Sequence, residues 1–178
     1  MSIKIIAAIG DNGLLGLEKD GTHSLPWHIP EDMKHFAHST HGSPVIMGRT
    51  TWESLPERFR PLPGRANIVL SRNQNYELPE GASGFVDLGE AARFAEGIAN
   101  GDKHVWVIGG ASIYKEALSF ADEIVLTRIA EESLPSLDPG ATRINFPEFE
   151  HLFYCAESTD YKQSEKGAAY RFETWNRK

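Results

Sequence analysis

Short apolar segments alternate with helix-like segments along most of the chain, and this alternation limits the possible folds more than any other feature. The strand-like segments are rich in Val and Ile and lie at residues 3–9, 45–47, 67–70, 104–108 and 123–129. Helix-like segments separate them, from residue 30 onward and at residues 50–55, 88–98 and 112–120. Near-continuous apolar strands suit a sheet covered on both faces, and alternation with helices suits parallel strands. We expect a single α/β domain over residues 1–178, with a central, mostly parallel, twisted sheet and helices on both faces.

The last part of the chain has a different pattern. Residues 151–159 and 168–175 resemble two strands joined by a polar stretch, which predicts an antiparallel hairpin at one edge of the sheet. Residues 10–26 and 131–147 are rich in Gly, Pro and other turn-forming residues. We expect both of these stretches to be long loops, a kind of segment that is often functional or mobile.

The charge balance excludes some classes of partner. The chain has 18 Lys and Arg residues against 25 Asp and Glu residues, which gives a formal net charge of −7. Nucleic acids and anionic membranes require a basic face, so we expect neither as a partner. A small anionic ligand requires only a few well-placed cations and stays possible.

Cysteine content and the N-terminal sequence bear on the compartment. Cys155 is the only cysteine, so an intrachain disulfide and a Cys-based zinc site are excluded, and we expect a buried, small apolar side chain there. The N-terminal residues lack the basic and apolar regions of a signal peptide. No apolar run reaches the roughly 18 residues of a membrane span. We therefore expect a cytoplasmic protein.

One acidic residue stands among apolar neighbours. Asp32 shares a predicted helix face with Ile29, Met33 and Phe36, because residues three and four apart lie on the same side of a helix. Burial would raise the pKa of such a carboxyl, and a carboxylate can bind a cationic, amidine-like heterocycle with both oxygens. The alternative is an ordinary interaction of the acid with the positive end of the helix.

Three strand ends carry residues that favour anions. Ile108-Gly109-Gly110-Ala111-Ser112 places free backbone N–H groups where a strand passes into a helix, and Gly48-Arg49-Thr50-Thr51 repeats this arrangement with an added cation. Ser71-Arg72 adds a hydroxyl and a guanidinium after a third strand. Taken singly, each is better explained by a plain turn or a surface arginine. Together at one edge of a parallel sheet they indicate a phosphate-containing ligand.

Two further patterns have the residue types of binding sites. Pro61-Leu62-Pro63-Gly64-Arg65 predicts a rigid turn that fixes the direction of Arg65, which suits a carboxylate ligand, although a solvated arginine is the alternative. His35, His38 and His41 recur every three residues. The third leaves the helix face of the first and no acidic or cysteine ligand completes the set, so we expect no metal.

Four motifs, taken in order, resemble dihydrofolate reductase, and the resemblance runs from Ile3 to Trp175. They are Leu25-Pro26-Trp27 with Pro30-x-Asp32, Val45-Ile46-Met47-Gly48-Arg49-x-Thr51-Trp52-Glu53-Ser54, Pro61-Leu62-Pro63-Gly64-Arg65-x-Asn67-Ile68, and Val107-Ile108-Gly109-Gly110-x-x-Ile113-Tyr114. The resemblance implies an NADPH-dependent reduction of 7,8-dihydrofolate to tetrahydrofolate, with hydride transfer to C6 and protonation at N5. It also implies dihydrofolate and antifolate-type inhibitors as ligands and a monomeric protein.

The resemblance assigns roles by position. The catalytic set that it implies is Asp32, Leu25, Trp27 and Thr127, with Thr127 supporting the acid. The implied substrate wall is Ile6, Ala8, Asp32, Met33, Phe36, Leu55, Leu62, Ile108, Tyr114 and Thr127, with Arg65 holding the carboxylate of the substrate tail. The implied cofactor set is Ala8, Leu15, Gly16, Gly48, Arg49, Thr50, Thr51, Leu70, Ser71, Arg72, Ile108, Gly109, Gly110, Ala111, Ser112, Ile113 and Tyr114. The Gly109–Gly110 peptide is implied to be cis.

The sequence departs from the family pattern at several places. Residues 19–24 form an insertion relative to short bacterial forms, in the loop that closes over the nicotinamide in the family. Ala111 replaces a common glycine, His28 replaces a smaller polar residue, and residues 131–143 form an extended segment without an assigned role. Two alternatives stay open: a related pterin or pyrimidine reductase, and a nucleotide-binding module without catalytic activity.

Overall fold

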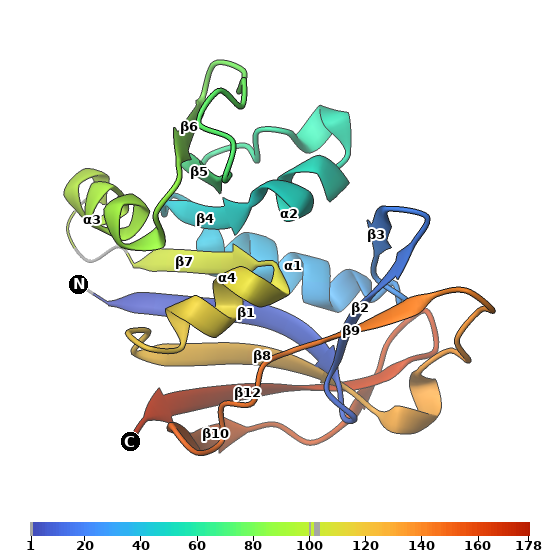
Figure 1. The fold of residues 1–178 in the computed structure, drawn as a ribbon. Helices are drawn as coiled ribbons and strands as arrows, with labels where there is room; N and C mark the ends of the chain where they lie inside the picture. The colour runs from blue at the N-terminus through green and yellow to red at the C-terminus, as the bar shows by residue number, and fades with distance from the viewer. Residues whose placement is uncertain (1, 100, 102–103) are drawn as a thin grey trace.

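A twisted nine-stranded sheet runs through the molecule, and the computed structural model describes residues 2–99, 101 and 104–178 (Figure 1). Eight strands lie in the order β10-β12-β8-β1-β7-β4-β5-β6, and β11 pairs with β12. The strands of this sheet are β1 Ile3–Gly10, β4 Val45–Gly48, β5 Asn67–Leu70, β6 Ala82–Phe85, β7 Val105–Gly109, β8 Glu123–Ile129, β10 Phe153–Ser158, β11 Lys162–Gln163 and β12 Ala169–Arg177.

The central strands are parallel and the C-terminal strands are antiparallel. β1 pairs in parallel with β7 and β8, and every residue of β4 and β5 is buried, which confirms the expectation of a sheet covered on both faces. β12 pairs antiparallel with β8 and β10, so the predicted edge hairpin is confirmed. β8 therefore has β1 on one side and β12 on the other, so it is an interior strand.

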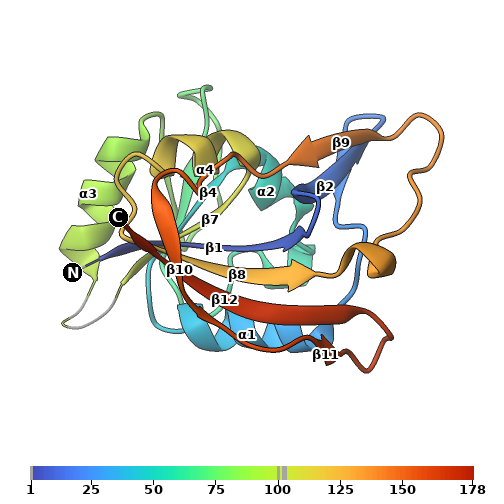
Figure 2. The ribbon, with the colours of Figure 1, turned by 90° about the horizontal axis from the view of Figure 1, so that it is seen from below.

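Helices cover both faces of the sheet, as expected (Figure 2). The helices are α1 Pro30–Thr40, α2 Arg49–Ser54, α3 Leu88–Ile98 and α4 Ala111–Ala117, with the short 3-10 helices η1 Glu57–Phe59 and η2 Glu131–Ser133. α3 and α4 cover one face through a buried cluster that includes Leu88, Ala95 and Ala117. α1 lies on the other face, where Phe36 packs near Trp52 of α2. Pro30 begins α1, a position where its missing N–H costs no hydrogen bond.

A second, three-stranded sheet corrects one prediction. The stretches expected to be long loops contain β2 Leu14–Lys19, β3 Thr22–Ser24 and β9 Thr142–Asn145, which pair antiparallel in the order β3-β2-β9. The inserted residues 19–24 form most of the β2–β3 hairpin. These strands are short and partly exposed, and β9 lies far along the sequence from β2. Local apolar periodicity therefore does not predict them.

The environment of Cys155 corrects a second prediction. Its side chain is exposed and its thiol donates to the Glu157 carbonyl oxygen at 3.4 Å. β10 is the outermost strand of its edge, and its residues after Phe153 are exposed. An apolar residue type on an edge strand therefore does not imply burial. No helix among the described residues is long and apolar enough to span a membrane.

Candidate active site

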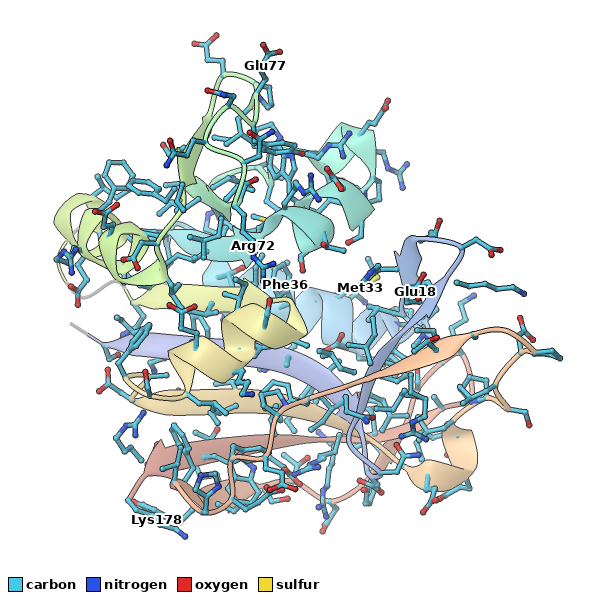
Figure 3. All side chains as sticks on the ribbon, viewed as in Figure 1. Glu18, Met33, Phe36, Arg72, Glu77 and Lys178 are labelled. Atoms are coloured by element: carbon cyan, nitrogen blue, oxygen red, sulfur yellow. The ribbon has the colours of Figure 1, made fainter. Side chains whose placement is uncertain are left out.

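A cavity of about 1330 Å³ opens between α1, the carboxyl ends of β4, β5 and β7, and the small sheet. All of the site residues predicted from the sequence line it, apart from Thr127. Met33 and Phe36 reach it from α1, and Arg72 reaches it from the segment after β5 (Figure 3). Residues from widely separated motifs therefore share one cavity.

Asp32 is the half-buried acid in this cavity. It lies in the first turn of α1, and the Thr127 hydroxyl of β8 donates to Asp32 Oδ1 at 2.6 Å. Burial raises the pKa of Asp32 above its ordinary value, and the hydrogen bond from Thr127 offsets part of that rise. Thr127 is itself buried, so it acts on the cavity through the carboxylate.

The wall around Asp32 is mostly apolar. Ile6, Phe36 and Leu62 belong to one packed cluster beneath the cavity, whereas Met33 is 54% exposed and faces open space. The buried Tyr114 hydroxyl donates to the Ile6 carbonyl oxygen at 2.8 Å. Burial, and secondly the charge of Asp32, raise the pKa of Tyr114, so this phenol stays protonated.

Backbone approaches the cavity closely at the end of β7. The Gly109–Gly110 peptide is cis, as the resemblance implies, and Gly109 has a φ of +131°. A Cβ added at Gly109 would lie 3.1 Å from Thr51 Oγ1, and one added at Gly48 would lie 3.1 Å from Ile113 Cγ1. A side chain at either glycine would therefore crowd Thr51 or Ile113.

Cations lie at two places on the cavity wall. Arg49 and Arg72 follow β4 and β5, and the Arg49 guanidinium lies 3.9 Å from the Glu53 carboxylate. Arg65 lies beyond Phe36, with its guanidinium carbon 5.6 Å from the ring centroid. Arg65 Nε is buried without a hydrogen-bond partner, and burial lowers the pKa of this side chain. An arginine left in this state suits an anionic ligand.

Several lining residues were not predicted. The main ones are His23, Ser24, His28, Arg58, Phe59, Glu116 and Ile144. His23 and Ser24 come from the β2–β3 hairpin and Ile144 from β9, so they reach the cavity only because the small sheet forms. Arg58 and Phe59 belong to η1, just before the Pro-Leu-Pro-Gly-Arg turn, and no motif of the sequence singles them out. Asp32 is therefore not the only acid on the wall, although Glu116 is exposed.

The sequence model of the dihydrofolate reductase family matches residues 2–177. The chain belongs to the dihydrofolate reductase family. The dihydrofolate reductase of Neisseria gonorrhoeae is 40% identical over 173 residues, which cover 97% of this chain and 96% of that protein. That of Mycobacterium tuberculosis is 34% identical over 175 residues, which cover 98% of each.

A solved structure agrees with this family membership. It is a dihydrofolate reductase from Enterococcus faecalis complexed with NADP(H) and RAB-propyl, and it is 28% identical to this chain. The TM-score is 0.79, and the match covers 99% of this chain and 96% of that one. The chain is therefore an oxidoreductase of the dihydrofolate reductase type, and its fold is that of the family.

Proposed function

We propose that this protein reduces 7,8-dihydrofolate to 5,6,7,8-tetrahydrofolate with NADPH, and that the cavity described above is its active site. One observation carries this proposal: the half-buried Asp32, held by Thr127, lies in the same cavity as Arg49, Arg65, Arg72 and the Gly109–Gly110 turn. An acid among apolar side chains suits a pterin, and the cationic strand ends suit a cofactor with several phosphates.

The residues at the carboxyl ends of β4, β5 and β7 fit NADPH. The helices that follow β4 and β7, α2 and α4, have no side-chain cap, so their first backbone N–H groups have no side-chain acceptor there. Anionic groups suit such positions. Arg49, Thr50 and Thr51 would hold phosphate groups, and Ser71 with Arg72 would hold the 2′-phosphate. When bound, NADPH supplies the hydride that reaches C6 of the pterin.

Asp32 binds and orients the pterin in this proposal. Its carboxylate accepts hydrogen bonds from the amidine-like edge of the ring and stabilises the form protonated at N5. The Tyr114 hydroxyl is engaged with the Ile6 carbonyl and keeps its proton, so it is not the proton donor. Water delivers the proton to N5, and Asp32 acts by charge and position.

The rest of the cavity positions the substrate and excludes solvent. Arg65 binds the carboxylate of the substrate tail, while Ile6, Phe36 and Leu62 pack against the ring system. Leu25 is 60% exposed and follows the β2–β3 hairpin, and it covers the reacting atoms when ligands are bound. Antifolate-type inhibitors with a protonated diaminopyrimidine ring occupy the same pocket and pair with Asp32.

The test measures NADPH oxidation by absorbance, with dihydrofolate added and omitted. We expect oxidation only when dihydrofolate is present, with tetrahydrofolate as product. Oxidation with another pterin but not with dihydrofolate would indicate a related pterin reductase. NADPH binding without turnover of either substrate would indicate a non-catalytic module.

We also propose that the chain acts as one domain, as a monomer and in the cytoplasm. The main sheet uses strands from both ends of the described chain, which supports one folding unit. The single cysteine has a free thiol, which suits a reducing compartment. Light scattering at micromolar concentration tests the monomer, and fractionation of the source cells tests the compartment.

A further inference from the structure

Glu31, the residue before Asp32 on α1, holds a turn from the far end of the chain. The Ser164 hydroxyl donates to Glu31 Oε2 at 2.7 Å, and the Glu165 backbone N–H donates to Oε1 at 2.9 Å. Both carboxylate oxygens are therefore engaged. These two hydrogen bonds hold the pKa of Glu31 below its ordinary value, so the side chain is charged at neutral pH.

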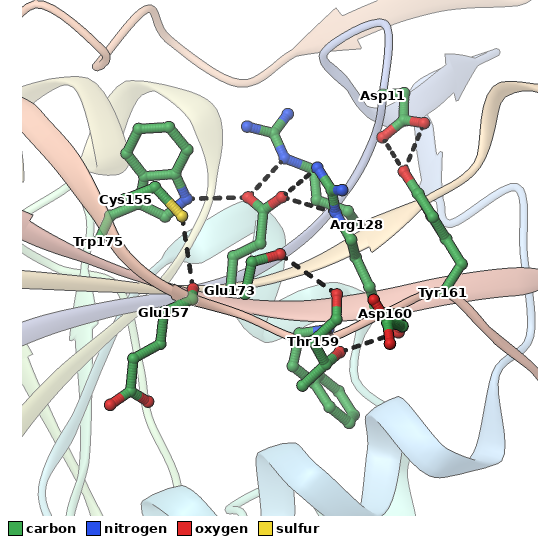
Figure 4. Close-up of polar contacts among 12 residues, drawn as sticks. Asp11, Arg128, Cys155, Glu157, Thr159, Asp160, Tyr161, Glu173 and Trp175 are labelled. Atoms are coloured by element: carbon green, nitrogen blue, oxygen red, sulfur yellow. Dashed lines mark hydrogen bonds and ion pairs between the residues drawn. The ribbon is translucent and has the colours of Figure 1, made fainter.

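The turn that contacts Glu31 is itself fixed to the protein. Ser164 is 4% exposed, its N–H donates to the Ala168 carbonyl at 2.8 Å, and its own carbonyl accepts from Gly167 N–H at 2.9 Å. The same connection between β10 and β12 is held a second time by Tyr161. The Tyr161 hydroxyl lies 2.7 and 2.6 Å from the two carboxylate oxygens of Asp11, at the end of β1 (Figure 4). Glu31 is thus attached to a segment that is anchored to the sheet.

The first turn of α1 has few other polar constraints. Ile29 stands at the N-cap position, where its side chain accepts no hydrogen bond, and Asp32 is joined to β8 through Thr127. Adjacent helix residues point about 100° apart, so Glu31 and Asp32 attach the same turn to two different parts of the structure. Together the two attachments resist rotation of the turn about the helix axis.

We infer that Glu31 is a positioning residue for the pterin-binding carboxylate: its attachment to the Ser164–Glu165 turn fixes the orientation of the Asp32 side chain toward the ring. This inference rests on the proposed function. It differs from a general stabilising role, because loss of Glu31 should weaken the binding only of ligands that pair with Asp32. It also differs from a favourable charge at the helix start, which any first-turn acid supplies without a partner.

The test compares two dissociation constants in a set of matched variants. One is for a 2,4-diaminopyrimidine antifolate, which reports on Asp32, and the other is for NADPH, whose phosphates are assigned to Arg49, Arg72 and their neighbours and not to Asp32. Glu31→Ala removes both hydrogen bonds and Ser164→Ala leaves one, whereas Glu31→Gln removes the charge and makes one of the two bonds depend on a reversed donor. Glu165→Ala is the control, because it removes a neighbouring charge and leaves the backbone donor in place.

We expect Glu31→Ala to raise the antifolate dissociation constant about tenfold and the NADPH constant by less than about twofold. The antifolate dissociation constants of Glu31→Gln and Ser164→Ala should lie between those of the parent and Glu31→Ala, and Glu165→Ala should have the parent's value. The double variant Glu31→Ala/Ser164→Ala should lose no more antifolate affinity than Glu31→Ala alone, because both substitutions remove the same contact. Thermal unfolding of each variant checks that it is folded.

Two results would overturn the inference: an antifolate constant unchanged in Glu31→Ala, or equal rises in both constants. Asp32→Asn is measured alongside to separate this inference from the proposed function. If Asp32→Asn also binds the antifolate as the parent does, the proposed role of the cavity fails. If Asp32→Asn loses binding and Glu31→Ala does not, only the positioning role fails.

Discussion

Asp32 and Glu173 contact consecutive residues of β8 on opposite faces of the sheet, and their surroundings differ sharply. Asp32 accepts one hydrogen bond from the neutral Thr127. Glu173 is buried and accepts from Arg128 Nε at 2.9 Å, Arg171 Nε at 2.8 Å and Trp175 Nε1 at 2.8 Å (Figure 4). The Asp32 carboxylate can accept further hydrogen bonds in the cavity, whereas both oxygens of the Glu173 carboxylate already accept hydrogen bonds inside the protein.

The two pKa values move in opposite directions for this reason. Burial raises the pKa of Asp32, and one neutral donor only partly compensates. Burial alone would also raise the pKa of Glu173, but hydrogen bonds from Arg128 and Trp175 and the charges of Arg128 and Arg171 outweigh it and hold the value below the ordinary one. A poorly compensated acid thus marks the functional face, while a fully paired one stabilises the fold.

The largest expected effect is on catalysis. Asp32→Asn should reduce kcat/KM at neutral pH by roughly 10²- to 10³-fold, because the charge that favours the protonated pterin is lost. Part of the activity should return in acid, where the substrate is protonated in solution. The matched control is Glu173→Gln, the same neutralisation on the other face, which should keep kcat/KM within about threefold in the folded protein. Unchanged activity of Asp32→Asn at neutral pH would remove the assigned role.

The next effect concerns stability. Arg128 and Arg171 lie directly opposite each other on β8 and β12, so Glu173→Ala leaves two like charges facing one another. We expect the free energy of unfolding to fall by about 3 kcal/mol, measured by denaturant titration. Glu157→Ala removes an exposed acid from β10 and should change it by less than about 0.5 kcal/mol. Equal losses in the two variants would mean that the buried network contributes nothing.

Arg72 is exposed, unlike Asp32 and Glu173. Arg72→Ala should raise the KM for NADPH about tenfold and the KM for NADH by less than about twofold, because only NADPH carries the 2′-phosphate. Steady-state kinetics with the two cofactors make this comparison. Equal changes in both KM values would place the 2′-phosphate elsewhere.

The smallest effect is a gain in stability. A carboxyl whose pKa is raised in the folded state binds more protons there than in the unfolded chain, so stability falls as pH rises from about the ordinary Asp value through the folded pKa. Asp32→Asn should therefore stabilise the protein at neutral pH, on the order of 1 kcal/mol, and this gain should vanish below the ordinary Asp pKa. Unfolding curves at several pH values test it, and a gain independent of pH would contradict the cause given.

Local pattern was enough to predict the main elements, and the resemblance to the family implied most of the cavity wall. β5, β8 and α3 have the bounds that their apolar periodicity predicts, because β5 is buried over its whole length, β8 over most of it, and α3 along one face. The motifs that surround Asp32, Arg65 and Gly109 indicated which residues line the cavity, since strand ends of a parallel sheet meet at one edge. The roles of these residues stay predictions until the variants are measured.

Features that depend on distant pairing were not predicted. The small sheet requires β2 to meet β9, and the exposure of Cys155 depends on β10 being the edge strand. The Glu173 network likewise depends on the register that sets Arg128 opposite Arg171. In each case the deciding contact joins residues far apart in sequence, so local apolar periodicity cannot predict it.

The position of β12 has a consequence for synthesis on the ribosome. Thr127 sits on β8, and β8 gains its second neighbouring strand only when residues 169–177 are available. A nascent chain that has emerged only as far as residue 160 already contains every predicted active-site residue, yet it has the open edge of β8 beside the acid pocket and no turn to hold Glu31. Ligand-binding competence should therefore appear late and abruptly during translation, so antifolates and NADPH have little chance of acting as templates for the emerging chain.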